Sequence, residues 1–192
     1  MASALFEVLG NEEFCVTALR GLDEAEVLSR LGTTASSVPY YRMEDVISHV
    51  GFESEAVQVH APGGDWVYLF DAIGSQGWSQ SAPVLLRLCR GTEAVSVCKI
   101  ESFSTKVVLA RDGVVIAEYD TWLDERPSGP EADGLERILT RAGFFLPPED
   151  RPDGFRHPRA ALEAVEEEFG LRVDPAALAE PLPTVTAPVL RG

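Results

Sequence analysis

The sequence predicts an α+β fold, in which one mainly antiparallel sheet of five to six strands has helices packed against it. Three observations lead to this prediction: runs with an apolar period of two, intervening stretches with an apolar period near that of a helix, and the tight-turn dipeptide Asp112-Gly113 between the last two runs. The expected order is strand, helix, helix, strand, strand, helix, strand. This order is compatible with a ferredoxin-like core that the hairpin of residues 106–119 extends.

The N-terminal part begins with a strand–turn–helix unit. Residues 14–19 are apolar and partly β-branched, which is typical of a buried strand. Asp23, with Glu26 three positions later, comes close to a capping box and begins a helix that Gly32 ends. A second, short helix is expected over residues 43–50.

The middle of the chain predicts a hairpin followed by a helix. Residues 55–60 and 65–71 are the two arms of the hairpin, because the intervening Ala-Pro-Gly-Gly favours a turn. Ser81 can cap a helix that extends to Arg90, and Pro83 fits within its first turn.

Three further strands and a helix complete the predicted core domain, which covers residues 1–146. Asp112-Gly113 is a strong signal for a two-residue hairpin turn. The strands are expected over residues 93–99, 106–111 and 114–119, and the helix carries the apolar residues Leu135, Ile138 and Leu139.

The composition changes after residue 146, where prolines recur and break regular structure. Residues 160–169 form an exception, because Leu162 and Val165 are spaced for one face of a helix and four glutamates are expected in solvent. We expect residues 147–192 to be a Pro-rich appendage with one amphipathic helix. The appendage either packs on the core or docks to another molecule.

Net charge is the strongest signal of composition. The 192 residues carry a formal charge of −15, and the acidic residues are spread along the chain. Such a surface opposes binding to nucleic acid and to anionic membranes, and it favours encounter with a basic protein. The alternative is that the charge only keeps the protein soluble.

The cysteines indicate the redox compartment. Cys15, Cys89 and Cys98 are odd in number, lie in apolar stretches and form no closely spaced pair, so we expect them to be reduced and to pack as small hydrophobes. The N-terminus has no basic region followed by an apolar core, which argues against a signal peptide. No apolar run is long enough to span a bilayer. We therefore expect a cytoplasmic protein.

A family resemblance is carried by the segment Glu12-Glu13-Phe14-Cys15-Val16-Thr17, followed by Arg20-Gly21-Leu22-Asp23 and later by Gly77-Trp78 and Asp112-Gly113. This pattern resembles an uncharacterised bacterial family, a domain of unknown function common in high-GC Gram-positive bacteria. The resemblance spans roughly residues 5–143. Because no activity is established for that family, the resemblance implies no catalytic residue.

No catalytic or metal motif of good specificity occurs in the sequence. A metal site formed by the cysteines and His60 would need closely spaced ligands, which are absent. A Cys–His nucleophile needs a thiol of lowered pKa, whereas Cys89 lies near the predicted C-terminus of a helix, where the dipole raises the pKa. Acidic pairs such as Glu44-Asp45 and Asp124-Glu125 lack a converging third group. We expect no catalytic residue, no metal and no cofactor.

The segment from Gly74 to Ser81 is the candidate ligand site. It precedes a helix, so its backbone N–H groups and the helix dipole could hold an anion, although it lacks the lysine of a phosphate-binding loop. The alternative is that its glycines only permit a turn and its tryptophan packs as a lid. The candidate ligand-binding residues are Trp66, Gly77, Trp78 and Ser81.

The function that we expect is that of a non-catalytic intracellular interaction or regulatory protein, immunity-like or adaptor-like, whose acidic surface binds a basic protein. The alternative is an enzyme or small-ligand-binding protein that uses a pocket near the Gly74–Ser81 segment. The sequence indicates no oligomeric state. The candidate partner-binding residues are Glu163, Glu166, Glu167 and Phe169, on the amphipathic helix.

Overall fold

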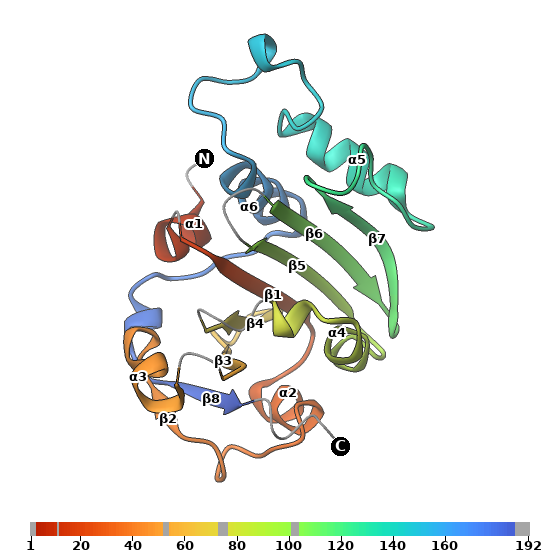
Figure 1. Ribbon diagram of the computed structural model, residues 1–192. Helices are drawn as coiled ribbons and strands as arrows, with labels where there is room; N and C mark the ends of the chain where they lie inside the picture. The colour runs from red at the N-terminus through yellow and green to blue at the C-terminus, as the bar shows by residue number, and fades with distance from the viewer. Residues whose placement is uncertain (1–2, 11, 52–53, 73–76, 101–103, 187–192) are drawn as a thin grey trace.

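The computed structural model contains an antiparallel sheet, and it describes residues 3–10, 12–51, 54–72, 77–100 and 104–186 (Figure 1). Within these residues the sheet has eight strands in the order β2-β8-β3-β4-β1-β5-β6-β7, and all neighbouring strands are antiparallel. The α+β class is therefore confirmed, whereas the predicted number of five to six strands is too small. The strands are β1 (Phe14–Arg20), β2 (Tyr40–Tyr41), β3 (Ala56–His60), β4 (Trp66–Asp71), β5 (Glu93–Ile100), β6 (Ser104–Arg111), β7 (Val114–Asp120) and β8 (Leu182–Thr186).

The two additional strands come from segments with weak strand signals. β2 is two residues long and lies in a turn-rich stretch. β8 contains Pro183, which lies opposite Tyr40 of β2. Because proline removes a hydrogen bond from the ladder, a run that contains it argues against an interior strand. The sequence therefore hides both strands.

Helices cover both faces of the sheet, which gives three layers (Figure 1). On one face, called the α6 face below, lie α1 (Ala4–Leu9), α5 (Ala132–Arg141) and α6 (His157–Phe169); on the other, called the α4 face, lie α2 (Glu24–Arg30) and α4 (Ala82–Leu88). The short α3 (Val46–Val50) follows β2, and the rings of Tyr41 and His49 stack there at 4.3 Å. Because both faces are covered, strands such as β1 are buried at successive residues.

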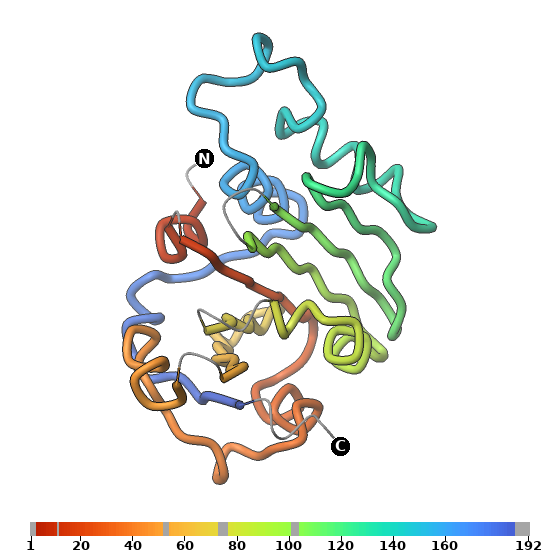
Figure 2. The backbone as a smooth tube through the Cα atoms, in the orientation of Figure 1, coloured from red at the N-terminus to blue at the C-terminus, as the bar shows by residue number. Residues whose placement is uncertain are grey.

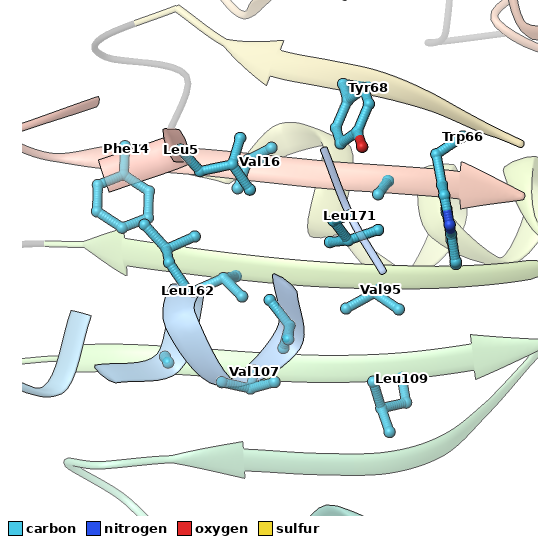
Figure 3. Packing of buried hydrophobic residues seen from close by; sticks show 14 of the residues in the cluster. Leu5, Phe14, Val16, Trp66, Tyr68, Val95, Val107, Leu109, Leu162 and Leu171 are labelled. Carbon is cyan, nitrogen blue, oxygen red and sulfur yellow. The ribbon is translucent and has the colours of Figure 1, made fainter. Parts of the chain in front are cut away.

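The larger core cluster lies on the α6 face (Figure 3). Val16, Val95 and Leu162 belong to this cluster, and they bring together β1, β5 and α6. Tyr68 is buried in it, and its hydroxyl donates to the carbonyl oxygen of Arg172 at 3.0 Å and accepts from the backbone N–H of Arg172 at 2.9 Å. A buried tyrosine needs a partner for its polar end. Tyr68 therefore fastens the segment after α6 to the sheet.

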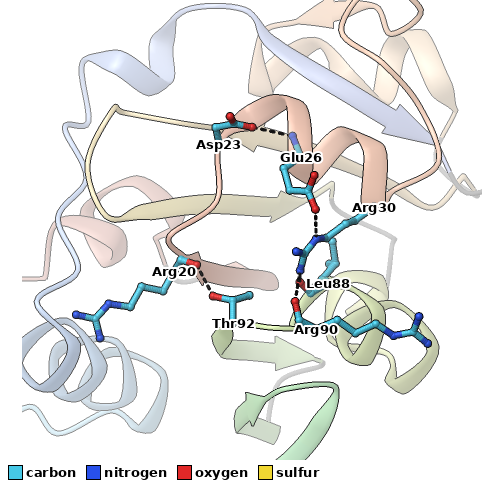
Figure 4. Close-up of polar contacts among 7 residues, drawn as sticks. All are labelled: Arg20, Asp23, Glu26, Arg30, Leu88, Arg90 and Thr92. Carbon is cyan, nitrogen blue, oxygen red and sulfur yellow. Dashed lines mark hydrogen bonds and ion pairs between the residues drawn. The ribbon is translucent and has the colours of Figure 1, made fainter.

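Polar contacts join α2 to α4 on the α4 face (Figure 4). The carboxylate of Asp23 accepts from the backbone N–H of Glu26 at 2.8 Å, which confirms the predicted N-cap. Arg30 pairs with Glu26 at 2.8 Å. Its guanidinium also donates to the carbonyl oxygens of Leu88 and Arg90 at 2.6 and 2.7 Å. These carbonyls lie at the end of α4, where helical partners are lacking.

The hairpin of β6 and β7 turns at Asp112-Gly113, as predicted. Both residues have positive φ, 52° and 78°, as a type I′ turn requires. The partner residues at the turn are Arg111 and Val114. The dipeptide therefore fixes the turn locally.

The C-terminal segment is built into the sheet and its cover. Figure 2 shows the blue C-terminal stretch returning to the orange N-terminal half of the chain, where β8 lies between β2 and β3. α6 contributes Ala161, Leu162 and Val165 to the core of the α6 face. Of the two alternatives for residues 147–192, the described part up to residue 186 thus packs on the core.

Candidate functional site

A cluster of buried hydroxyl groups lies on the α4 face. The Thr17 hydroxyl of β1 lies 2.8 Å from Ser96 Oγ of β5 and 2.9 Å from Ser79 Oγ. Ser79 belongs to η2 (Trp78–Gln80), a single turn of 3-10 helix before α4. All three residues are 0% exposed. Gln80 Nε2 donates to Ser96 Oγ at 3.1 Å, so the cluster satisfies its own hydrogen bonds.

Strand register places two cysteines beside these hydroxyls. Residues two apart on a strand share a face. Cys15 therefore lies on the α4 face with Thr17, and Cys98 lies there with Ser96. In the pairing of β1 with β5, Cys15 lies opposite Cys98 with 4.0 Å between the Cα atoms, and the two form a disulfide. The prediction of three reduced thiols is therefore wrong for this pair. Cys89 is buried and free.

Asp71, at the end of β4, contacts this cluster at Ser79. Its Oδ2 accepts from the backbone N–H of Ser79 at 3.0 Å, whereas its Oδ1 is buried without a hydrogen-bond partner. Burial raises the pKa of this carboxyl from 3.8 to about 7, and hydrogen bonds from Ser79 and Trp78 oppose the rise. Such a group exchanges a proton near neutral pH.

The segment from Gly77 to Ser81 covers this cluster. Gly77 has a φ of 76°, and a Cβ there would lie 3.2 Å from Ile100 Cδ1. The Ser81 hydroxyl donates to the carbonyl oxygen of Trp78 at 2.7 Å. Trp78 itself is buried in the core of the α4 face. Residues 74–76 of the predicted ligand segment lie outside the described residues.

The four candidate ligand-binding residues are divided between the two faces of the sheet. Trp66 belongs to the core of the α6 face, where it meets the ring of Phe169 edge-on at 6.3 Å. Trp78 lies on the α4 face, next to Gly77 and Ser81. The structure therefore brings together three of the four, and ligand binding by them stays a prediction.

A groove on the α6 face has a cavity volume of about 1160 Å³. It lies over β5, β6 and β7 and is bordered by α5 and the C-terminal end of α6. Its lining includes the apolar side chains of Val95, Leu109, Ile116, Ile138 and Phe169.

Charged side chains also line the groove. Arg111 Nη1 pairs with Glu131 at 2.7 Å, and Arg141 pairs with Glu168. Five acidic and three basic side chains belong to the lining, and two of the acidic ones, Glu93 and Glu136, pair with Arg20 and Arg126 outside it. Asp133, on α5, forms no ion pair within the described residues. It is therefore available to a cationic group.

The predicted partner-binding residues of α6 differ in their surroundings. Glu166 is buried, and its Oε1 accepts from the backbone N–H of Leu5 at 3.0 Å, so the expectation that this glutamate is solvated is wrong. The reason is that the first turn of α1 leaves N–H groups without helical partners, and a carboxylate satisfies one of them. Glu167 is exposed, and Phe169 lies in the groove lining. Glu163 pairs with Arg159 at 2.9 Å.

Sequence reasoning missed Asp71, Thr17, Ser79 and Ser96. The available signal for a shared site was that Cys15 and Thr17, which can both form hydrogen bonds, lie two positions apart in an otherwise apolar strand. That signal shows which residues share a face, but not which strands are neighbours.

The described residues hold no group of three or more His, Cys, Asp or Glu side chains that could bind a metal ion. None of the helices within them is long and apolar enough to cross a membrane.

Comparison with protein families gives one finding. The model of a family of unknown function (DUF6461) matches residues 2–185, which extends beyond the expected resemblance to include α6 and most of β8. Neither the curated proteins nor the solved structures gave a match.

Proposed function

We propose that this chain, which belongs to the family of unknown function DUF6461, is a non-catalytic interaction protein, immunity-like or adaptor-like. It binds a basic segment of another protein. The groove on the α6 face is the proposed binding surface. We also propose that the protein works in the cytoplasm of a bacterium.

The groove is the observation that carries this proposal. Its volume of about 1160 Å³ is larger than that of typical small-molecule sites. An apolar floor with a charged rim is the usual composition of a protein-binding surface. Ile138 of α5 and Phe169 of α6, at the borders of the groove, offer contacts for an apolar anchor of the partner.

Charge selects the class of partner. The whole chain carries a charge of −15, which accelerates encounter with a cationic molecule. In the groove lining, Asp133 and Arg137 have no ion-pair partner within the described residues, whereas Arg111 and Arg141 are paired with glutamates. A partner with arginine or lysine beside an apolar side chain would match this pattern.

A synthetic peptide tests the groove directly. The probe is a short fluorescein-labelled peptide in which arginine and leucine alternate, and its binding is followed by fluorescence anisotropy at low and high salt. Asp133→Lys should weaken binding by about twofold to fivefold at low salt, because an exposed charge contact contributes up to about 1 kcal/mol. Salt should weaken binding to the wild type.

Glu44→Lys is the matched control, since Glu44 is exposed near α3 and lies outside the groove lining. It changes the net charge as much as Asp133→Lys does. Equal affinities of the two variants for the peptide would show that only net charge matters and would exclude the groove.

A second candidate function rests on the cluster under the Gly77–Ser81 segment. There, the buried Asp71 Oδ1 has no partner, which is unusual for a carboxylate and suits a small ligand that donates a hydrogen bond. A small molecule retained in native mass spectra of the wild type, but lost in Asp71→Ala, would favour ligand binding.

We also propose that the core of the sheet is ferredoxin-like. Its elements are β1, α2, β3, β4, α4 and β5 in chain order, with β2, η1 and α3 inserted between α2 and β3 and η2 between β4 and α4, and the four strands lie in the order β3-β4-β1-β5. This is a β-α-β-β-α-β unit, to which β6 and β7 add the predicted hairpin.

A further inference from the structure

The sulfur atoms of the Cys15–Cys98 pair lie beside hydroxyl groups. Cys15 Sγ is 3.8 Å from Ser79 Oγ and 3.9 Å from Ser96 Oγ. A disulfide has no proton to donate and no charge to stabilise, so these hydroxyls contribute little to the oxidised form. A thiol or thiolate at the same place gains hydrogen bonds from them. The surroundings therefore suit the reduced state of the pair.

The same serine connects Cys15 to a carboxyl group. Asp71 Oδ2 accepts from the Ser79 backbone N–H at 3.0 Å, and the Ser79 side chain is among the groups that lower the pKa of this carboxyl. The charged group that acts on Asp71 is Glu55, whose negative charge adds to the effect of burial in raising the pKa. Asp71 therefore holds a proton for part of the time at neutral pH and can transfer it.

From these contacts we infer that Cys15 and Cys98 form a reversible redox pair that low-molecular-weight thiols reduce, and that Asp71 supplies, through the Ser79 hydroxyl, the proton that Cys15 takes up. The redox pair lies on the α4 face, on the opposite side of the sheet from the groove.

The site of attack follows from the surroundings of the two sulfur atoms, because a departing sulfur benefits from a proton donor beside it. Cys15 is the sulfur that contacts Ser79. Attack at Cys98 therefore leaves Cys15 as the departing sulfur, next to its proton donor.

The reduction proceeds in two exchanges. A thiolate from the reducing thiol attacks Cys98 Sγ, the Cys15–Cys98 bond breaks, and Cys15 leaves with the electron pair of that bond. Cys15 takes the proton of the Ser79 hydroxyl, which takes the proton of Asp71. The first exchange leaves a mixed disulfide between Cys98 and the reducing thiol. A second thiolate then attacks the sulfur of the reducing thiol in this mixed disulfide. Cys98 leaves as a thiolate, and the two reducing thiols become a disulfide. Cys98 and Asp71 then take up protons from solvent, so that two thiols are oxidised and two cysteines are reduced.

Access limits the rate of this reaction. Cys15 and Cys98 are 3% and 0% exposed, so a thiol reaches them only when the Gly77–Gln80 segment separates from the sheet. Local openings of this kind occur below the free energy of global unfolding. Reduction of the native protein is therefore slower than that of an exposed disulfide, and it remains proportional to the thiol concentration while the segment recloses quickly.

Dithiothreitol is the probe for the test. The protein is incubated with mixtures of reduced and oxidised dithiothreitol. The reaction is then quenched with acid, the protein is denatured and alkylated, and the mass of the protein is measured. The oxidised chain should take one alkyl group, on Cys89, and the reduced chain three. In the range where the rate is proportional to thiolate concentration, Asp71→Asn should lower the rate at pH 6 by about tenfold or more, a modest value for general acid catalysis, and have little effect at pH 9.

Asp65→Asn is the matched control, because it removes an exposed carboxylate from the other end of the same hairpin. Ser79→Ala should reproduce the Asp71→Asn profile, and circular dichroism verifies that each variant is folded. Three alkyl groups in every dithiothreitol mixture would show that the pair does not form and would overturn the inference. A rate ratio of wild type to Asp71→Asn that is independent of pH would overturn the role of Asp71.

Discussion

Replacing Asp71 by asparagine should make the stability of the protein less dependent on pH. The folded protein raises the pKa of Asp71 from 3.8 to about 7, chiefly because the carboxyl is buried. Between these two values the folded chain holds a proton that the unfolded chain has lost. The contribution of Asp71 to the free energy of unfolding of the wild type therefore falls as pH rises from about 4 to about 7, and it is constant above pH 7.

The magnitude follows from the same shift. Each pKa unit corresponds to 1.36 kcal/mol, so raising the pKa from 3.8 to about 7 costs the wild type roughly 4 kcal/mol above pH 7. At pH 5 only about 1.6 kcal/mol of this cost is present. The asparagine that replaces Asp71 cannot ionise, and its amide oxygen can accept the hydrogen bond from the Ser79 backbone N–H. The variant should thus gain about 2–3 kcal/mol relative to the wild type between pH 5 and pH 8.5.

Urea unfolding followed by circular dichroism measures this change at both pH values. The difference between wild type and Asp71→Asn cancels the titration of the other carboxylates and histidines, which both chains share. Asp65→Asn serves again as an exposed control and should show no such change. A difference between wild type and Asp71→Asn that is the same at pH 5 and pH 8.5 would refute the assignment of a raised pKa.

Four further predictions concern stability. Leu28→Ala should cost about 2–4 kcal/mol in urea unfolding, because Leu28 is 0% exposed in the core of the α4 face; an unchanged curve would contradict its burial. Gly129→Ala should lower the melting temperature, since a Cβ there would lie 2.6 Å from the carbonyl oxygen of Ile116, whereas Gly134→Ala, with no such contact, should not. Glu166→Ala should cost about 1–3 kcal/mol by leaving the Leu5 N–H without a partner, and Glu167→Ala, which is exposed, should cost little. Burial lowers the pKa of His60, and the charge of Asp174 only partly offsets this effect. The unfolded chain therefore binds a proton at His60 before the folded chain does, and the free energy of unfolding should fall as pH falls below 6.5. An NMR titration of His60 with a midpoint above 6.5 would contradict this.

Local elements could be predicted from the sequence because their physical causes act over a few residues. The Asp23 cap joins atoms three residues apart, and the Asp112-Gly113 turn depends on the φ angles of two residues. The apolar periods show which side chains are buried, so the α+β class follows from them as well. None of these signals depends on where the rest of the chain lies.

Strand neighbours could not be predicted in this way. Cys15 and Cys98 are 83 residues apart, and only the pairing of β1 with β5 places them opposite each other. Alternation along a strand shows that Cys15 and Thr17 share a face, yet it does not identify the strand that lies beside them. The sequence therefore predicted separate, buried thiols, whereas the sheet brings Cys15 and Cys98 together as a disulfide.

The sequence by itself determined the class of fold, the helix cap, the hairpin turn and the net negative charge of the chain, because each depends on neighbouring residues or on composition alone. Tertiary structure decided that Trp66 and Trp78 lie on opposite faces, that β8 enters the sheet and that Glu166 is buried against α1. It also decided that Asp71 meets Ser79. The physical reason is that burial and the pKa of a side chain depend on groups that only the folded chain brings together.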